Sequence, residues 1–289
     1  MILRLHTYGR RGTACILALL FFTGCEEEIT RVELTDNAFS IYGVINPLVD
    51  VQALRVFQID ALLELTRPEP IDATVLSTDL DSGQSIAWQD SVVQFQNGTF
   101  GHVFWAPFQP IHDHRYLLEV IRSDGVKAEV LTRVPPFSTA EILEHNVDGF
   151  FLTQPVLWRD APHLININVT YFTNVGKFNV NYNLQQTKVN GGQIVTLDFR
   201  DDVELVFQMA IFFGIQEVVL DKIEMRVVVT DESWDPPGGT FDADLFSEPG
   251  TFSNVVNGFG FVGAGYSASV EWVPEDEVLR ELGFFIPGG

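Results

Sequence analysis

The sequence predicts a mainly β protein, with an N-terminal β-sandwich of the immunoglobulin or transthyretin kind and then a second β-rich domain with one or two short helices. Three observations predict this class. Short segments of alternating apolar and polar residues recur along the chain, turn residues separate them at short intervals, and helical spacing of apolar residues is confined to two places.

The first domain is expected to span residues 36–135. Its second strand shows the pattern, since Leu54 and Val56 fall on one face and Ala53 and Phe57 on the other. Asn-Gly and Asp-Gly pairs mark turns between later strands. Strands are predicted at 38–45, 52–59, 73–77, 86–89, 92–95, 100–110 and 115–122, and residues 130–134 lead out of the domain.

The pair Pro135-Pro136 is the predicted domain boundary, because proline donates no hydrogen bond to a strand ladder. The second domain would then cover residues 136–289. Alternation predicts its half-buried strands, and Asn190-Gly191-Gly192 reads as a turn. The predicted strands are 164–172, 177–185 and 218–230, with the glycine-rich stretch around 258–266 as a further strand.

Two segments have helical spacing. From Asp201 onward, apolar residues recur every three or four positions, and the acidic pair Asp201-Asp202 suits a helix N-terminus. We expect this helix to lie across the second sheet. A short terminal helix is predicted to begin at Pro274 and to end at Gly283. Residues 231–253 are predicted to form a long irregular loop, of a kind that is usually functional or mobile.

The N-terminal segment has the features of a targeting signal. Residues 1–14 carry three arginines and no acid, and a short apolar run follows that cannot span a bilayer. The run ends in Phe22-Thr23-Gly24-Cys25, which resembles the lipobox of bacterial lipoproteins. We therefore expect a signal peptide at 1–24, lipidation of Cys25 and an acidic tether at 25–35. An ordinary secreted cysteine is the alternative interpretation.

Three acids follow the predicted lipid site. Glu26, Glu27 and Glu28 are similar to signals that send lipoproteins to the outer face of the outer membrane in some bacteria. A solvated linker explains the same residues equally well. The expected location is the outer membrane, on its periplasmic side or at the cell surface.

Composition limits the partners. Removal of residues 1–24 takes away three of the 17 basic residues and none of the 39 acidic ones, which leaves a formal charge of −25. Such a chain would repel nucleic acid and anionic lipid, so membrane attachment must come from the acyl chains. The two cysteines lie in the signal peptide and at the anchor. An internal disulfide and a thiolate metal site are therefore excluded from the mature domains.

Residues Phe252–Ala264 resemble the "SNI-x-GG-x-G-x-F-x-A" stretch near the C-terminus of a family of Bacteroidetes-type outer-membrane lipoproteins, a domain of unknown function. The order of features is also similar, from the lipobox through a glycine-containing first strand at Tyr42–Pro47 to a late strand that enters an Asp-Gly turn. The resemblance implies a cell-envelope lipoprotein, often associated with nutrient uptake, and it implies no catalytic residues.

Metal-binding candidates are few. His112 and His114 share a face if their segment is extended, and His102 is close in sequence, but no further ligand stands at a recognisable spacing. Structural histidines are the more common case. The long loop contains acids that could supply oxygen ligands for calcium, but their spacing is not that of an EF-hand. A solvated loop without bound metal is the simpler interpretation. These acids are Asp231, Glu232, Asp235, Asp242, Asp244 and Glu248.

No catalytic motif is recognisable, so we expect a binding or accessory protein that works with an outer-membrane transporter and needs no cofactor. A structural envelope protein is the alternative, and a glycan-acting enzyme is a weaker one, because no carboxylate pair stands out. Tryptophans could stack on sugars, although core or interface positions are the more usual ones. They are Trp88, Trp105, Trp158, Trp234 and Trp272.

Overall fold

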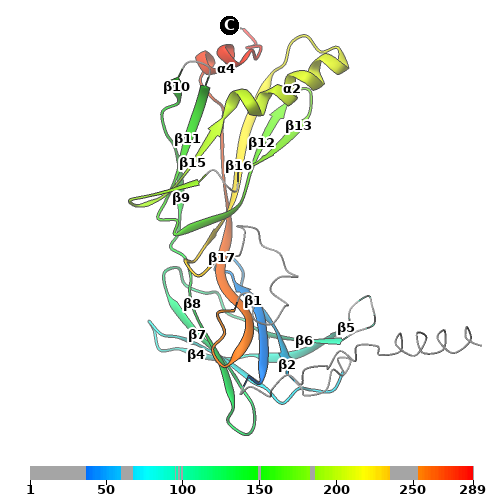
Figure 1. Ribbon diagram of the computed structural model, residues 1–289, viewed down its shortest axis with the longest axis vertical. Coiled ribbons are helices and arrows are strands. Elements are labelled where there is room, and N and C mark those ends of the chain that lie inside the picture. The colour runs from blue at the N-terminus through cyan, green and yellow to red at the C-terminus, as the bar shows by residue number, and fades with distance from the viewer. Residues whose placement is uncertain are drawn as a thin grey trace, which may run out of the picture. The chain divides into compact units, whose positions relative to one another are not determined.

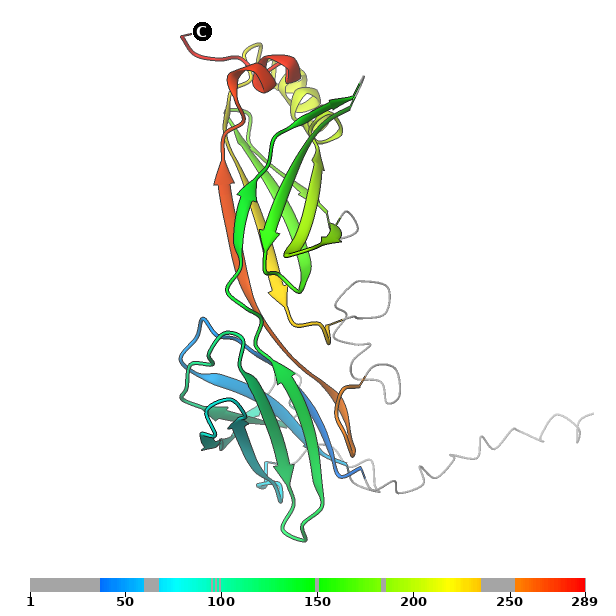
Figure 2. The same cartoon turned by 90° about the vertical axis from the view of Figure 1, so that its left-hand side faces the viewer.

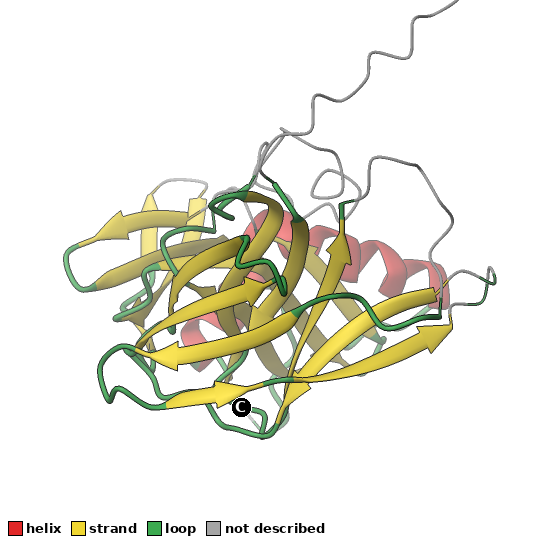
Figure 3. Ribbon diagram, turned by 90° about the horizontal axis from the view of Figure 1, so that it is seen from below, coloured by secondary structure: helices red, strands yellow, loops and turns green. Residues whose placement is uncertain are grey.

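The computed structural model describes residues 37–59, 68–94, 96, 98, 100–148, 151–182, 186–234 and 253–288. Residues 36–289 form one compact unit. Strands dominate its described residues, which also contain two helices, α2 (Phe199–Phe213) and α4 (Asp276–Leu282) (Figures 1 and 3). The predicted mainly β class is confirmed.

The first sandwich contains two facing sheets. A four-stranded sheet has the order β4-β3-β7-β8, and its partner layer is the β1-β2-β6-β5 part of a larger sheet. Their inner faces share one core, in which Ile41, Leu54 and Leu118 are fully buried. The strands are β1 (Phe39–Ile45), β2 (Gln52–Gln58), β3 (Thr74–Asp79), β4 (Ser85–Ala87), β5 (Gln89–Gln94), β6 (Phe100–Ala106), β7 (Arg115–Ile121) and β8 (Lys127–Arg133).

The second sandwich is built in the same way. One layer has the order β10-β11-β15-β14, with β9 also paired to β11, and the other is the β13-β12-β16-β17 part of the larger sheet. Its core includes Trp158, Tyr171 and the inner face of α2. The strands are β9 (Thr139–Ile142), β10 (Asn146–Asp148), β11 (Phe151–Arg159), β12 (His163–Thr173), β13 (Lys177–Asn181), β14 (Gln186–Val189), β15 (Gly192–Asp198), β16 (Leu220–Thr230) and β17 (Gly258–Trp272).

Strand β17 belongs to both sandwiches, which it joins into one eight-stranded sheet. Its first half runs parallel to β1, from Phe39↔Gly258 to Ile45↔Ala264, and its second half runs antiparallel to β16. Figure 2 shows it as one long orange-to-red strand. The prediction of consecutive domains at 36–135 and 136–289 did not include this strand in the first core, where Val262 and Ala264 are buried.

Glycines allow the close approach of β17 to its neighbours. Gly260 has a φ of 103°, and a Cβ at this position would lie 2.2 Å from the carbonyl oxygen of Ile41. At Gly263, a Cβ would lie 2.3 Å from the ring of Trp234. A backbone and an indole thus occupy the space that side chains would fill.

Helix α2 begins two residues before the predicted start. The side chain of Asp198 caps it by accepting hydrogen bonds from the N–H groups of Arg200 and Asp201, and Gly214 ends it in the left-handed conformation. The terminal helix differs more. Its first residue is Asp276 and Glu275 is the N-cap residue, so Pro274 does not occupy the first helical position.

No helix in the described part of the chain is long and apolar enough to cross a lipid bilayer.

Candidate binding pocket

The structure does not bring the predicted histidine ligands together. Residues 112 and 113 form a turn in which Asp113 has a φ of 69°, so His112 and His114 do not share the face of a strand. The Nδ1–H of His112 donates to the carbonyl of Pro135 at 2.8 Å, and its ring packs edge-to-face against Tyr266. In the described residues, no three His, Cys, Asp or Glu side chains gather as metal ligands would.

His114 and His102 each have a carboxylate partner. Nδ1 of His114 lies 2.8 Å from Asp79 Oδ2, and Nδ1 of His102 lies 2.9 Å from Asp90 Oδ2. Burial acts to raise the pKa of Asp79, but hydrogen bonds from His114 and Ser82 outweigh it and lower that pKa to about 2. The histidines therefore hold neighbouring segments of the first sandwich.

Several predicted site residues lie outside the described residues. These are the lipidation site Cys25, the acidic triplet Glu26, Glu27 and Glu28, and the loop acids Asp235, Asp242, Asp244 and Glu248.

The tryptophans offer little open surface for a sugar. Trp88, Trp158 and Trp234 are buried, and the indole N–H of Trp88 donates to Ser77 Oγ at 2.9 Å. Trp105 and Trp272 are half-buried. The interpretation of the tryptophans as core residues is therefore confirmed for the three buried ones.

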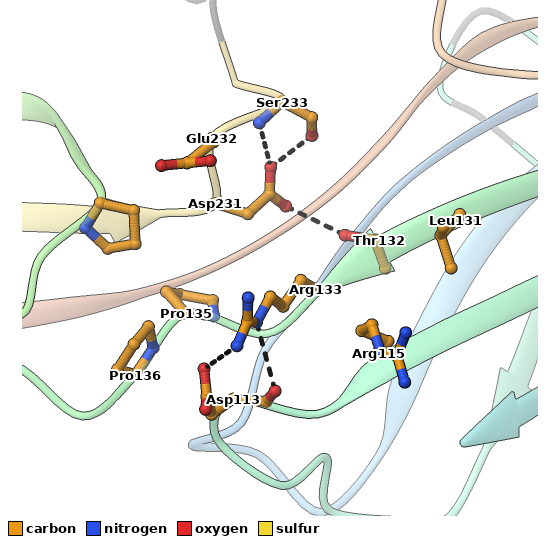
Figure 4. Close-up of a pocket in the computed structure, with 11 residues that line it drawn as sticks. Asp113, Arg115, Leu131, Thr132, Arg133, Pro135, Pro136, Asp231, Glu232 and Ser233 are labelled. Atoms are coloured by element: carbon orange, nitrogen blue, oxygen red, sulfur yellow. Dashed lines mark hydrogen bonds and ion pairs between the residues drawn. The ribbon is translucent and has the colours of Figure 1, made fainter. Parts of the chain in front are cut away.

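A pocket of about 400 Å³ lies where β7, β8 and β16 approach the segment that follows β8 (Figure 4). Prolines and Leu131 provide its apolar surface, and two arginines provide its positive charge. Its lining residues are Asp113, Arg115, Leu131, Thr132, Arg133, Pro135, Pro136, Pro162, Asp231, Glu232 and Ser233.

Asp231 fixes the wall of this pocket. Its Oδ2 accepts hydrogen bonds from Thr132 Oγ1 at 3.0 Å and from the N–H of Ala264 at 2.5 Å. Its Oδ1 accepts from both the N–H and the hydroxyl of Ser233. One buried carboxylate thus joins the ends of β8 and β16 to β17. Asp231 is a structural residue here, since the protein itself uses the oxygens that were considered as calcium ligands.

Tyr266 holds the proline segment that lines the pocket. Its hydroxyl accepts a hydrogen bond from the N–H of Ser138 at 2.7 Å and donates to the carbonyl of Pro136 at 2.8 Å. The proline pair, the predicted domain boundary, is therefore fixed against β17 and lines the pocket.

Each pocket arginine is paired with one acid. The Nε and Nη2 groups of Arg115 donate to both oxygens of Asp81, and this pairing lowers the pKa of Asp81. The same two groups of Arg133 donate to the carbonyl and the carboxylate of Asp113 (Figure 4). Because a guanidinium has five N–H groups, each arginine keeps donors for a ligand.

This arrangement suits binding. Proline and leucine surfaces can contact an apolar group, while the arginine donors can orient a carboxylate, a peptide carbonyl or a sugar oxygen. Sequence reasoning identified neither arginine, because the pocket depends on contacts between residues that are far apart along the chain. The proline pair was the available local signal, and it was interpreted as a boundary.

No family model and no curated protein matches the chain. Among solved structures it is similar to bovine butyrophilin, with 11% sequence identity and a TM-score of 0.21, over 65% of this chain and 91% of that one. A likeness at this level carries no argument. The class of this protein, a mainly β chain with two sandwiches that share a strand, rests on its own sheets and cores.

Proposed function

We propose that this chain is a lipid-anchored accessory protein of the bacterial outer membrane, which binds a transporter or a substrate delivered to one. The observation that carries the proposal is Phe22-Thr23-Gly24-Cys25 at the end of a basic segment and a short apolar run. A lipidated cysteine gives a strongly acidic chain a means of membrane attachment that does not depend on lipid charge.

The pocket supports a binding role for the body of the protein. Two of the few basic side chains of an acidic chain, Arg115 and Arg133, line one pocket beside fixed prolines. Preorganised donors next to apolar surface are the usual composition of a binding site. The proposed ligand is therefore an acceptor-rich segment or molecule.

Replacing Cys25 by alanine should release the protein from membranes, because the acyl chains would have no attachment point. Fractionation of cells, followed by immunodetection in the membrane and soluble fractions, checks this. Replacing Cys15, which lies in the predicted signal peptide, by alanine is the matched control and should leave the protein in the membrane fraction. Membrane retention of the Cys25→Ala variant would contradict the anchor.

The partner is tested by affinity purification of the full-length protein, tagged at its C-terminus, from detergent-solubilised envelopes. We expect an outer-membrane transporter in stoichiometric amount. Arg133→Glu should reduce its recovery, because this change reverses a charge in the pocket. Arg122→Glu is the control, since Arg122 also pairs with an acid, Asp124, but does not line the pocket. Recovery of the lipoprotein alone would contradict the accessory role.

A further inference from the structure

The outer face of α2 exposes large apolar side chains, three of them in its last turn. Ile211 is 79% exposed, Phe212 78%, Phe213 57% and Leu205 51%. The rings of Phe212 and Phe213 pack edge-to-face with their centroids 5.2 Å apart. Adjacent exposed aromatic and aliphatic residues of this kind mark interaction surfaces in soluble proteins.

The helix does not need these residues for its own packing. Val203, Val206 and Ala210 already bury its inner face against the core of the second sandwich. An amphipathic helix normally places polar residues opposite such a face. In α2 the first turns follow that rule with Asp201 and Glu204, whereas the last turn does not.

A groove of about 490 Å³ runs beside this apolar end, between α2 and α4. Val203, Phe207 and Leu282 give it an apolar floor, and Ile211 belongs to both the groove and the exposed end. The groove is lined by Arg200, Asp201, Val203, Glu204, Phe207, Gln208, Ile211, Glu281 and Leu282.

The charges around the groove are mainly negative. Asp201, Glu204 and Glu281 line it, and the one lining cation, Arg200, is already paired through Nη2 with Glu281 Oε1 at 2.7 Å. The last turn of α2 contains no basic residue to balance the negative end of the helix dipole. A ligand for this surface therefore has to combine apolar side chains with positive charge.

We infer that the α2–α4 groove and the apolar end of α2, hereafter the helical face, dock a segment of a partner protein that carries apolar side chains next to lysine or arginine. The acidic rim favours this occupant over the others. An anionic bilayer would be repelled, and a second copy would place one acidic rim against another. The inference rests on the proposed accessory role and adds a second surface, besides the pocket of Arg115 and Arg133, through which a partner is held.

The test uses the unlipidated body, residues 36–289, which forms a compact unit with its own cores. A fluorescent amphipathic helical peptide of leucine and lysine is the probe, and its leucine–glutamate counterpart is the control peptide. Fluorescence anisotropy should show binding of the lysine peptide that weakens as salt is added and is much weaker for the glutamate peptide.

Substitutions then locate the binding. Combining Phe212→Ser with Phe213→Ser should lower the affinity of the body for the lysine peptide by about tenfold or more. Exposed aromatic side chains often contribute much of the binding energy at such surfaces. Glu204→Lys should also lower this affinity. Leu48→Ser, at a comparably exposed apolar residue of the first sandwich, is the matched control and should change nothing.

The inference is overturned if the lysine peptide does not bind, if it binds equally after the double substitution, or if both peptides bind alike. It is also overturned if the body binds phospholipid vesicles. The same holds if analytical ultracentrifugation shows a dimer that the substitution of Phe212 by serine abolishes. Because the body lacks Cys25, these outcomes are independent of the fractionation experiment that tests the anchor.

Discussion

Replacing Gly260 by alanine should lower the free energy of unfolding by about 4 kcal/mol or more, an effect large enough to prevent folding at moderate temperature. Two costs combine. The residue has a φ of 103°, which strains any L side chain, and the new Cβ would lie 2.2 Å from the carbonyl oxygen of Ile41. Since that oxygen is part of the β1 backbone, relief requires β17 to separate from β1. Urea denaturation followed by circular dichroism measures the effect.

Gly125→Ala is the matched control. Gly125 also has a positive φ, of 90°, but nothing lies within 4 Å of the position that its Cβ would take. Its substitution should cost only backbone strain, about 1 kcal/mol. Equal losses at the two glycines would show that the close approach of β17 and β1 does not carry the effect.

The second large effect concerns Asp202, a buried residue of the first turn of α2. Its Oδ2 accepts hydrogen bonds from the hydroxyls of Tyr171 and Tyr182, the latter at 2.5 Å. Burial raises the pKa of Asp202 to about 6, although both hydroxyl bonds act to lower it. Burial also raises the pKa of both tyrosines, so they remain donors.

A carboxyl whose pKa is higher in the folded state stabilises the protein fully below its unfolded pKa of 3.8, and this contribution is lost as the pH rises through about 6. Relative to Asp202→Asn, the wild-type protein should therefore lose about 3 kcal/mol of unfolding free energy between pH 3.5 and pH 7. Urea unfolding of both proteins across this range measures the difference.

The control for this prediction is Ile211→Ala, at an exposed residue of the same helix that carries no ionisable group. Its stability difference from the wild-type protein should stay nearly constant over the same pH range. If the Asp202→Asn difference were equally flat, the buried carboxyl would not titrate between the two pH values, and the raised pKa would be wrong.

Local patterns predicted much of this fold, and the missed strands have local reasons. Alternation located β2, β12 and β16 within one or two residues. Strand β11 was missed, and it contains Pro155, which pairs with Thr196 in the middle of its ladder. Strand β15, which pairs with it, was missed as well. Pro155 is unusual within a strand, and Gly192, the first residue of β15, was assigned to the predicted turn Asn190-Gly191-Gly192.

Long-range pairing could not be predicted from one sequence. The parallel register of β1 with β17 joins opposite ends of the body, and the hydrogen bond between Thr132 and Asp231 joins residues 99 apart. Alternation shows which face a residue occupies but not which strand lies beside it. The proposed anchor is the opposite case, because the motif that predicts it is contiguous and involves no tertiary contact.

The shared strand also sets the order in which the protein can fold. The ribosome makes β1 well before β17, so the edge of β1 that pairs with β17 stays unpaired while strands β2 to β16 are synthesised. Because the first core also needs Val262 and Ala264, the part made first cannot complete its core early. Under the proposed lipid-anchored location, the chain crosses a membrane before it folds, and this delay would keep it competent for export.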